Sequence, residues 1–90
     1  MAAVEKVAKL VAQRFGQTLR DLRGDQTQEA VAERAEIHRS ALALIEAGER
    51  NPRLTTVIKL AGALDVPPSK LLAGLQWRPG QREEGEFQIH

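Results

Sequence analysis

The sequence predicts one all-α domain of five helices followed by a short tail, and three observations support this fold class. Apolar residues recur at steps of three and four up to about residue 75, which is the spacing of amphipathic helices. Glycine and proline interrupt these runs where short helices would have to end. With 90 residues, of which 42% are apolar, the chain can bury one modest core and is too short for two domains.

The first predicted helix is long and spans residues 4–22, where the apolar spacing is continuous. Gly16 lies inside this helix and costs about 1 kcal/mol relative to alanine. This glycine either marks the close approach of another helix or has no special role. Arg23, Gly24 and Asp25 then end the helix.

Two short helices joined by a tight turn follow, and the rest of the chain is organised around them. Thr27 is a suitable N-cap for a helix that starts near Gln28. The second helix covers about Arg39 to Ala47. Gly48 stands where a left-handed C-terminal cap is needed, and a following Asn-Pro pair prevents continuation. The stretch from Gln28 to Ala47 therefore has the layout of a helix-turn-helix.

A fourth helix is predicted from the apolar spacing of residues 54–64, and it stops before the run Val66-Pro67-Pro68. Pro68 or Ser69 opens a short fifth helix, which ends near Gly74. The predicted core consists of apolar residues from all five helices and their turns: Phe15, Leu19, Leu22, Val31, Ile37, Leu42, Ile45, Leu54, Val57, Leu60, Leu64, Val66 and Leu72.

The tail after Leu75 has a pattern of its own. Residues 86–90 alternate apolar and polar side chains, as a half-buried β-strand does. Such a strand could fold back on residues 76–78 as a hairpin or pair with the same segment of a second chain, and the alternative is a frayed tail. We assign self-association to Trp77, Phe87 and Ile89, together with the N-terminal turns around Val4, Val7 and Val11.

Three segments carry a resemblance to a known family. Residues 26–32 read Gln-Thr-Gln-Glu-Ala-Val-Ala, residues 37–48 read Ile-His-Arg-Ser-Ala-Leu-Ala-Leu-Ile-Glu-Ala-Gly, and residues 50–57 read Arg-Asn-Pro-Arg-Leu-Thr-Thr-Val. In order and spacing they resemble the Cro and lambda-repressor type of helix-turn-helix (XRE-like), a family of phage and bacterial transcription regulators. The match covers about residues 15–72.

This resemblance implies a lambda-repressor-like DNA-binding domain over residues 1–75, in which residues 1–10 extend the first helix and residues 76–90 form the tail. It implies that the chain is a sequence-specific DNA-binding regulator. Many relatives have glycine where this chain has Glu36. A left-handed conformation costs a non-glycine residue about 1–2 kcal/mol, so we expect a slightly reshaped turn there.

In this fold class the second helix of the pair enters the major groove, with its first residues at the base edges. If Leu42 and Ile45 point inward, Arg39, Ser40 and Leu44 lie on the outward face. Arg39 can pair bidentately with a guanine, and Leu44 can contact a thymine methyl group. The predicted base contacts are Arg39, Ser40, His38 and Leu44, although for His38 we favour simple helix capping.

Phosphate contacts are expected at the N-termini of the paired helices, where unpaired N–H groups bind anions. The resemblance assigns a grip on the backbone to Gln28. The predicted phosphate contacts are Gln28, Arg50, Asn51 and Arg53. The resemblance also implies a structural ion pair between Glu46 and an arginine late in the first helix, with Arg23 as the first candidate and Arg20 as the second.

The formal net charge is only +1, so the prediction of DNA binding depends on local placement of charge. The chain has no cysteine, no phosphate-binding glycine-rich loop and only two distant histidines, so we expect neither an enzyme nor a metal, cofactor or small-molecule site. No apolar run has the length of a signal or membrane segment, which favours a cytoplasmic protein.

The preferred hypothesis is a homodimer that binds double-stranded DNA at a near-palindromic site. The alternative is a protein-interaction module on the same fold, antitoxin-like or a bridging subunit. The feature that favours the alternative is the outward face of the second helix of the pair, which carries few polar side chains.

Overall fold

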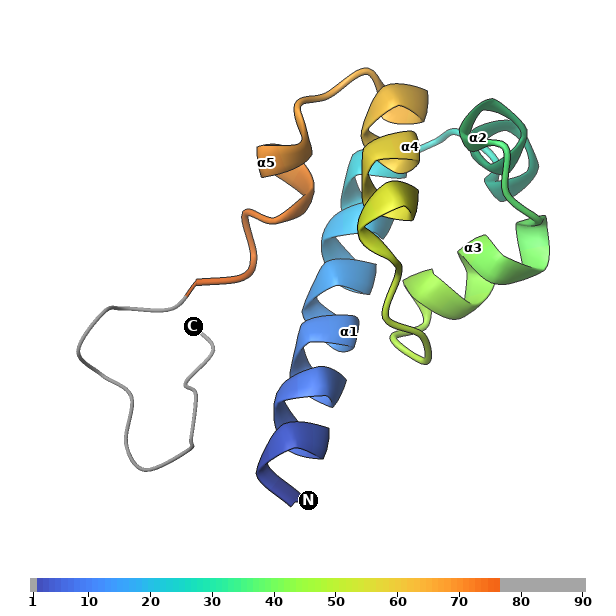
Figure 1. Cartoon of the computed structure of the whole chain (residues 1–90). Helices are drawn as coiled ribbons and strands as arrows, with labels where there is room; N and C mark the ends of the chain where they lie inside the picture. Colours follow the sequence, from blue (N-terminus) through green and yellow to red (C-terminus); the bar gives the residue numbers. More distant parts are fainter. Residues whose placement is uncertain (1, 77–90) are drawn as a thin grey trace.

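The computed structural model describes residues 2–76 of the chain, and the side chains of residues 6–76. These residues form five helices: α1 (Ala2–Arg23), α2 (Gln28–Ala35), α3 (Arg39–Glu46), α4 (Leu54–Leu64) and α5 (Pro68–Leu71). In Figure 1, α1 runs the full length of the helical body, and α4 lies in front of it with α2 and α3 on one side and α5 on the other. The all-α, five-helix prediction is confirmed. The tail prediction falls on residues 77–90, outside the described part.

The boundaries of the two paired helices follow from local capping. Thr27 Oγ1 accepts a hydrogen bond of 3.1 Å from the Ala30 N–H, which satisfies one of the free donors at the start of α2. Gly48 has a φ of +75°, the left-handed conformation that the sequence predicts after α3. The predicted start at Gln28 and the stop near Ala47 are therefore both correct to within one residue.

The turn between α2 and α3 differs from the prediction. Glu36 adopts the left-handed conformation, with φ 56° and ψ 44°. The Ile37 N–H donates to the Ala32 carbonyl at 3.0 Å, and the Glu36 N–H donates to the Glu33 carbonyl at 3.1 Å. These bonds close the C-terminus of α2 in the left-handed geometry that a glycine at position 36 would adopt. The expected reshaping of the turn was therefore wrong, and the strain of the left-handed conformation lies in the Glu36 backbone.

The core lies where α1, α2, α3 and α4 meet, and it contains Phe15, Leu19, Leu42 and Leu60 almost completely buried. Two predicted core residues were wrong: Leu54 and Leu72 are exposed, and Leu71 is buried in place of Leu72. The rest of the predicted core is buried or packs against it. The further buried residues are alanines of α1, α2 and α4: Ala12, Ala32, Ala35 and Ala61.

Gly16 marks a close approach of two helices, the first of the two roles considered for it. A Cβ atom at this position would lie 2.4 Å from the carbonyl oxygen of Ile45 and 2.7 Å from that of Glu46. Real Cβ atoms essentially never come so close to other atoms, so only glycine fits this face of α1 without movement. The contact fixes the C-terminal end of α3 against α1.

A candidate DNA-binding interface

Helix α3 has one face in the core and one face toward solvent. Leu42, Ile45 and Glu46 are buried, and the first residues of the helix, Arg39 and Ser40, are exposed. Leu44 and its neighbour Ala43 are half-buried on the outer side. The residues predicted to contact bases therefore share one accessible face, and the small side chains on this face allow the helix backbone to approach a groove closely.

Among the residues that the structure describes, Arg39 has one ionic neighbour. Its Nε atom lies 3.9 Å from Oε1 of Glu29, which belongs to the first turn of α2, and both side chains are largely exposed. Ion pairs between exposed side chains contribute little to stability because water and salt screen them. The Arg39 guanidinium can consequently leave Glu29 and rotate toward a base without a large loss.

His38 occupies the N-cap position of α3, with φ −69° and ψ 142°, but its side chain makes no capping hydrogen bond. The side chain is exposed and lies directly before Arg39. Simple capping by the imidazole, which the sequence analysis favoured, is therefore not observed. The backbone alone takes the cap conformation, and the ring nitrogens point to no partner among the described residues.

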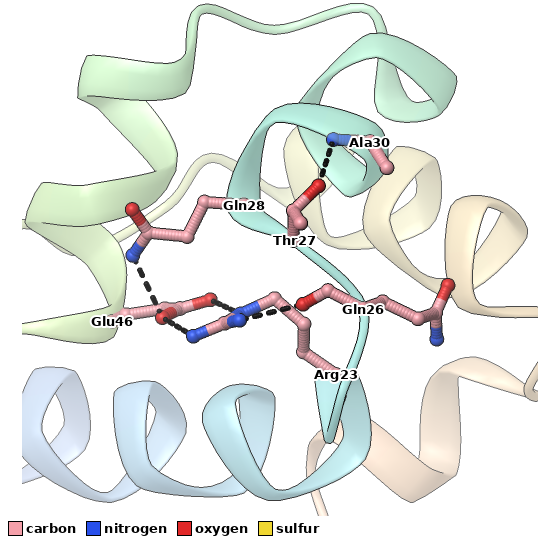
Figure 2. A network of polar contacts seen from close by, with 6 residues as sticks. All are labelled: Arg23, Gln26, Thr27, Gln28, Ala30 and Glu46. Carbon is pink, nitrogen blue, oxygen red and sulfur yellow. Dashed lines mark hydrogen bonds and ion pairs between the residues drawn. The ribbon is translucent and has the colours of Figure 1, made fainter.

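A network of polar contacts joins the end of α1, the start of α2 and the end of α3 (Figure 2). Arg23 Nε donates to Oε2 of Glu46 at 2.6 Å, and Arg23 Nη2 donates to Oε1 of Glu46 at 2.9 Å. The same guanidinium donates through Nη1 to the carbonyl oxygen of Gln26 at 2.7 Å. The ion pair that the resemblance assigned to Arg23 and Glu46 is thus present and bidentate, the strongest geometry available to such a pair.

The burial of Glu46 explains why the pair matters for the fold. Its side chain is 3% exposed, and a lone carboxylate at this depth would lose its hydration without compensation. The hydrogen bonding that Arg23 donates to the Glu46 carboxylate raises the pKa of Arg23 above its ordinary value, with desolvation as a smaller opposing effect. When folding raises the pKa of a cation, its ion pair stabilises the folded state fully at any pH below the unfolded-state pKa. This stabilisation is lost only as the pH rises through the folded-state pKa. For arginine that window lies in strong alkali, so the guanidinium stays charged near neutral pH.

Gln28, the predicted grip on phosphate, belongs to the same network. Its Nε2 atom donates to Oε1 of Glu46 at 3.0 Å, so the side chain is oriented by a buried carboxylate. A primary amide carries two N–H donors, and Glu46 takes one of them. The second N–H is free for an acceptor at the N-terminus of α2. A structural contact and a phosphate contact are therefore compatible in the same residue.

The loop after α3 carries the three other residues predicted to bind phosphate, and all three are exposed: Arg50, Asn51 and Arg53. Asn51 has an additional role, because its Nδ2 atom donates to the carbonyl oxygen of Ala8 in α1 at 3.0 Å. This bond ties the loop to the first helix. This bond could not be predicted from the sequence, since a main-chain carbonyl inside a helix leaves no trace in the pattern of side chains.

Comparison with known proteins agrees with this geometry. The HTH_3 helix-turn-helix family matches residues 18–71, more than half of the chain. The chain belongs to this family. It is also 38% identical over 61 residues to the control protein C.BamHI of Bacillus amyloliquefaciens, a match that covers 64% of this chain and 75% of the relative.

Two solved structures extend the comparison. The restriction-modification controller protein C.AhdI from Aeromonas hydrophila is 40% identical and superposes with a TM-score of 0.65, over 67% of this chain and 94% of C.AhdI. An HTH_3 family transcriptional regulator from Vibrio cholerae is 25% identical with a TM-score of 0.69, over 73% of this chain and 38% of that protein.

These relatives make the chain a DNA-binding transcriptional regulator of the XRE, lambda-repressor-like class. Helix α3 is then the recognition helix, and its exposed face is the surface that such regulators present to the major groove. Among the residues that the structure describes, no helix is both long and apolar enough to span a membrane.

Proposed function

We propose that this protein binds a near-palindromic DNA site as a homodimer, with half-sites about one helical turn apart. The observation that supports this best is the exposed face of α3, which is held against α1 by the Gly16 contact and the Glu46 network. A rigidly positioned helix loses little freedom when it enters a groove. A monomer of this size offers few base contacts, and two-fold symmetry doubles them.

The four residues proposed to contact bases have different roles. Three lie in α3, and the fourth is at its N-cap. Arg39 pairs with O6 and N7 of a guanine, the commonest specific contact in the major groove. Ser40 donates to a base or a phosphate, and Leu44 packs on a thymine methyl group or a sugar. His38, whose ring is exposed and makes no cap bond, is a third donor at the base edges.

The proposed phosphate contacts come from two places, the start of α2 and the loop after α3. Gln28 offers its second N–H at the start of α2, where the helix dipole also favours an anion. Arg50 and Arg53 offer charged groups in the loop after α3, and Asn51 keeps one N–H free after its bond to Ala8. Such contacts fix the register of the protein on the duplex and do not read the sequence.

The relatives suggest which genes are regulated. C.BamHI is named a control protein and C.AhdI a restriction-modification controller protein, and both are close to 40% identical to this chain. We therefore propose that this regulator acts on genes of a restriction-modification system. Mapping of bound sites on genomic DNA tests this step: sites next to endonuclease or methyltransferase genes are expected, and sites only elsewhere would reject it while leaving DNA binding intact.

Selection of bound sequences from a random DNA pool tests the main proposal. We expect enrichment of one two-fold symmetric motif at moderate salt. Equal binding to all sequences would favour the alternative, a protein-interaction module that is antitoxin-like or a bridging subunit. One observation favours that alternative: the outward face of α3 carries few polar side chains, because Ala43, Leu44 and Ala47 lie beside Arg39 and Ser40. An Arg39→Ala variant that selects the same motif would exclude Arg39 as a base contact and would leave specific DNA binding intact.

The sequence predicts self-association through Trp77, Phe87 and Ile89. These residues lie outside the part of the chain that the structure describes, so this assignment stays a prediction. Double-stranded DNA and a second copy of the chain are the partners that we propose.

A further inference from the structure

The N-terminal half of α1 extends beyond the other helices. In Figure 1 its first turns, drawn in dark blue, run past α3 and past the loop that joins α3 to α4, and no other helix of the described residues lies beside them. The family match covers residues 18–71, so this half of α1 also lies outside the matched region. A helix end that packs on little of its own chain has its side chains available for another molecule.

Two contacts fix the loop after α3 against this part of α1. The Nδ2 atom of Asn51 donates to the carbonyl oxygen of Ala8 at 3.0 Å. Gly48, at the start of the same loop, lies so close to Gln13 that a Cβ atom on the glycine would be 3.0 Å from Gln13 Cα. The loop therefore crosses α1 over a segment that includes Lys9.

Lys9 shares one side of α1 with two other residues. Gln13 is four residues after Lys9, and Lys6 is three residues before it, the spacings that bring helical side chains together on one face. All three side chains are exposed. We call Lys6, Lys9 and Gln13 the basic stripe of α1.

The basic stripe lies on the same side of the molecule as the exposed face of α3. The buried side of α1 carries Phe15 and Leu19. Going round the helix from these two residues, Gly16 comes next and meets the end of α3, and the stripe follows within about a quarter of a turn more. Helix α3 therefore separates the stripe from the core, and the stripe borders the side to which α3 turns Ser40 and Leu44.

The positive charge of the chain is concentrated on α1. This helix has five basic and two acidic residues, whereas the rest of the chain has eight basic and ten acidic residues. The net charge of +1 is thus the balance of +3 on α1 and −2 elsewhere. A solvated helix face usually mixes both signs of charge, but the stripe carries only cations. The loop that crosses it adds Arg50 and Arg53 against one acid, Glu49, so the junction stays positive.

We infer that the basic stripe of α1 is part of the DNA-binding surface, with Lys6 and Lys9 on phosphate oxygens next to those that Arg50 contacts. This inference rests on the proposed function, in which α3 enters the groove and the loop after it contacts phosphates. It adds residues to which neither the comparisons nor the sequence assigned a role in DNA binding. From the sequence, this part of α1 is predicted to take part in self-association through its valines.

The chemistry of lysine suits this position. Its ammonium group is a compact charge on a flexible stem of four carbons, so it can reach a phosphate from a helix that does not itself enter the groove. The bond from Asn51 to Ala8 holds α1 in a fixed position relative to the loop, so the two lysines and Arg50 approach the duplex as one unit. Contacts of this kind add affinity and carry no sequence information.

Titrations with DNA at several salt concentrations test the inference. Lys6→Gln and Lys9→Gln each remove one charge and keep a long side chain of good helix propensity. Each phosphate contact contributes about 0.9 to the slope of log affinity against log salt concentration. The double variant should therefore lose about two units of slope for each bound chain, and its affinity at about 100 mM salt should fall at least about tenfold. The selected motif should stay the same.

Ethylation interference locates the contacts on the DNA. Ethylation removes the charge of one phosphate, so it weakens binding where the protein touches that phosphate. The wild type should show interfering phosphates next to those that disappear in an Arg50→Ala variant, and the double lysine variant should lose them. Lys9→Arg keeps the charge and should keep both the affinity and the pattern.

Lys70→Gln is the matched control, because Lys70 is an exposed lysine on α5, on the other side of α1 (Figure 1). It should leave the salt slope and the pattern unchanged. Equal losses in Lys70→Gln and in the double variant, with the pattern intact, would show an effect of net charge alone and would overturn the inference. A double variant that binds as the wild type does overturns it too. So does a loss of affinity that comes with a changed sedimenting mass and an intact pattern.

The outcome is separable from the proposed function. A wild type that selects a DNA motif, beside a double variant with the same slope and the same interfering phosphates, rejects only the role of the stripe. A wild type that selects no motif and shows no interfering phosphates rejects the proposed function, and the role of the stripe with it.

Discussion

The contact between Gly16 and α3 leads to a prediction in which two physical effects have opposite signs. Gly16 lies inside a long helix, where replacement of glycine by alanine normally stabilises by about 1 kcal/mol. Here the new Cβ would lie 2.4 Å from the carbonyl oxygen of Ile45 and 2.7 Å from that of Glu46. Both neighbours are backbone atoms, so no side-chain rotation relieves the overlap. Helix α3 has to move away from α1.

Overpacking of a core costs typically about 1–3 kcal/mol. Because the obstacle is backbone and two atoms are involved, we expect Gly16→Ala to fall at the upper end, a net loss of about 2–3 kcal/mol. For a domain of this size that corresponds to a fall in Tm of roughly 10 °C or more. Urea and thermal unfolding followed by far-UV circular dichroism measure it. Displacement of α3 should also weaken DNA binding.

Gly62 provides the matched control. It lies in the middle of α4, and a Cβ there would meet nothing within 4 Å. Gly62→Ala should therefore show the helix-propensity effect alone, a gain of about 0.5–1 kcal/mol. The comparison is made at concentrations where the protein is monomeric. A Gly16→Ala protein as stable as the wild type, beside a stabilised Gly62→Ala protein, would refute the close approach of α1 and α3.

Four further predictions follow from the structure. Glu46→Ala leaves Arg23 without its carboxylate and should lower the free energy of unfolding by about 2–4 kcal/mol, less than for a fully buried pair because 20% of the Arg23 side chain is exposed. A loss below about 1 kcal/mol in urea unfolding would show that the pair contributes no more than an ordinary surface ion pair. Arg39→Ala should cost about 1–3 kcal/mol of DNA affinity and relax one base position, and an unchanged motif in a repeated DNA selection would contradict base reading. Arg53→Ala should weaken binding to all sequences alike and reduce the salt slope by about one unit in titrations at several salt concentrations, whereas a new preferred sequence would exclude a phosphate contact. Glu36→Gly should raise the free energy of unfolding by up to about 1 kcal/mol because the left-handed strain disappears, and a measured loss would mean that the Glu36 conformation is not strained.

Much of the fold could be predicted from the sequence because its signals are local. The capping role of Thr27, the left-handed Gly48 and the prolines each fix a helix end through the geometry of a few neighbouring residues. The five helices and most of the core follow from these ends and from the apolar spacing. The Glu36 turn was mispredicted because the hydrogen bonds of the α2 C-terminus outweigh the preference of one residue.

The two errors in the core, at Leu54 and Leu72, have separate causes. A single helical turn such as α5 contains no repeated spacing, so nothing in the sequence decides whether Leu71 or Leu72 faces inward. In α4 the apolar residues fall in two sets, with Val57 and Ala61 inward and Leu54 and Ile58 outward. Periodicity placed Leu54 in the core together with Val57, since the spacing alone does not report which of two apolar sets faces inward.

The residues of the proposed DNA-binding surface could be named from the sequence, but their internal contacts could not. From the sequence, Gln28 is predicted to be a surface residue that contacts phosphate, and Glu46 is predicted to be an inward-facing residue in a structural ion pair. In the structure the two share a hydrogen bond of 3.0 Å, and Arg23 completes the connection to α1 (Figure 2). The carboxylate of Glu46 therefore does two things: it neutralises a cation at the junction of three helices, and it orients the Gln28 amide before any DNA arrives. Because that orientation is already fixed, the entropy cost of the proposed phosphate contact would fall on folding and not on binding.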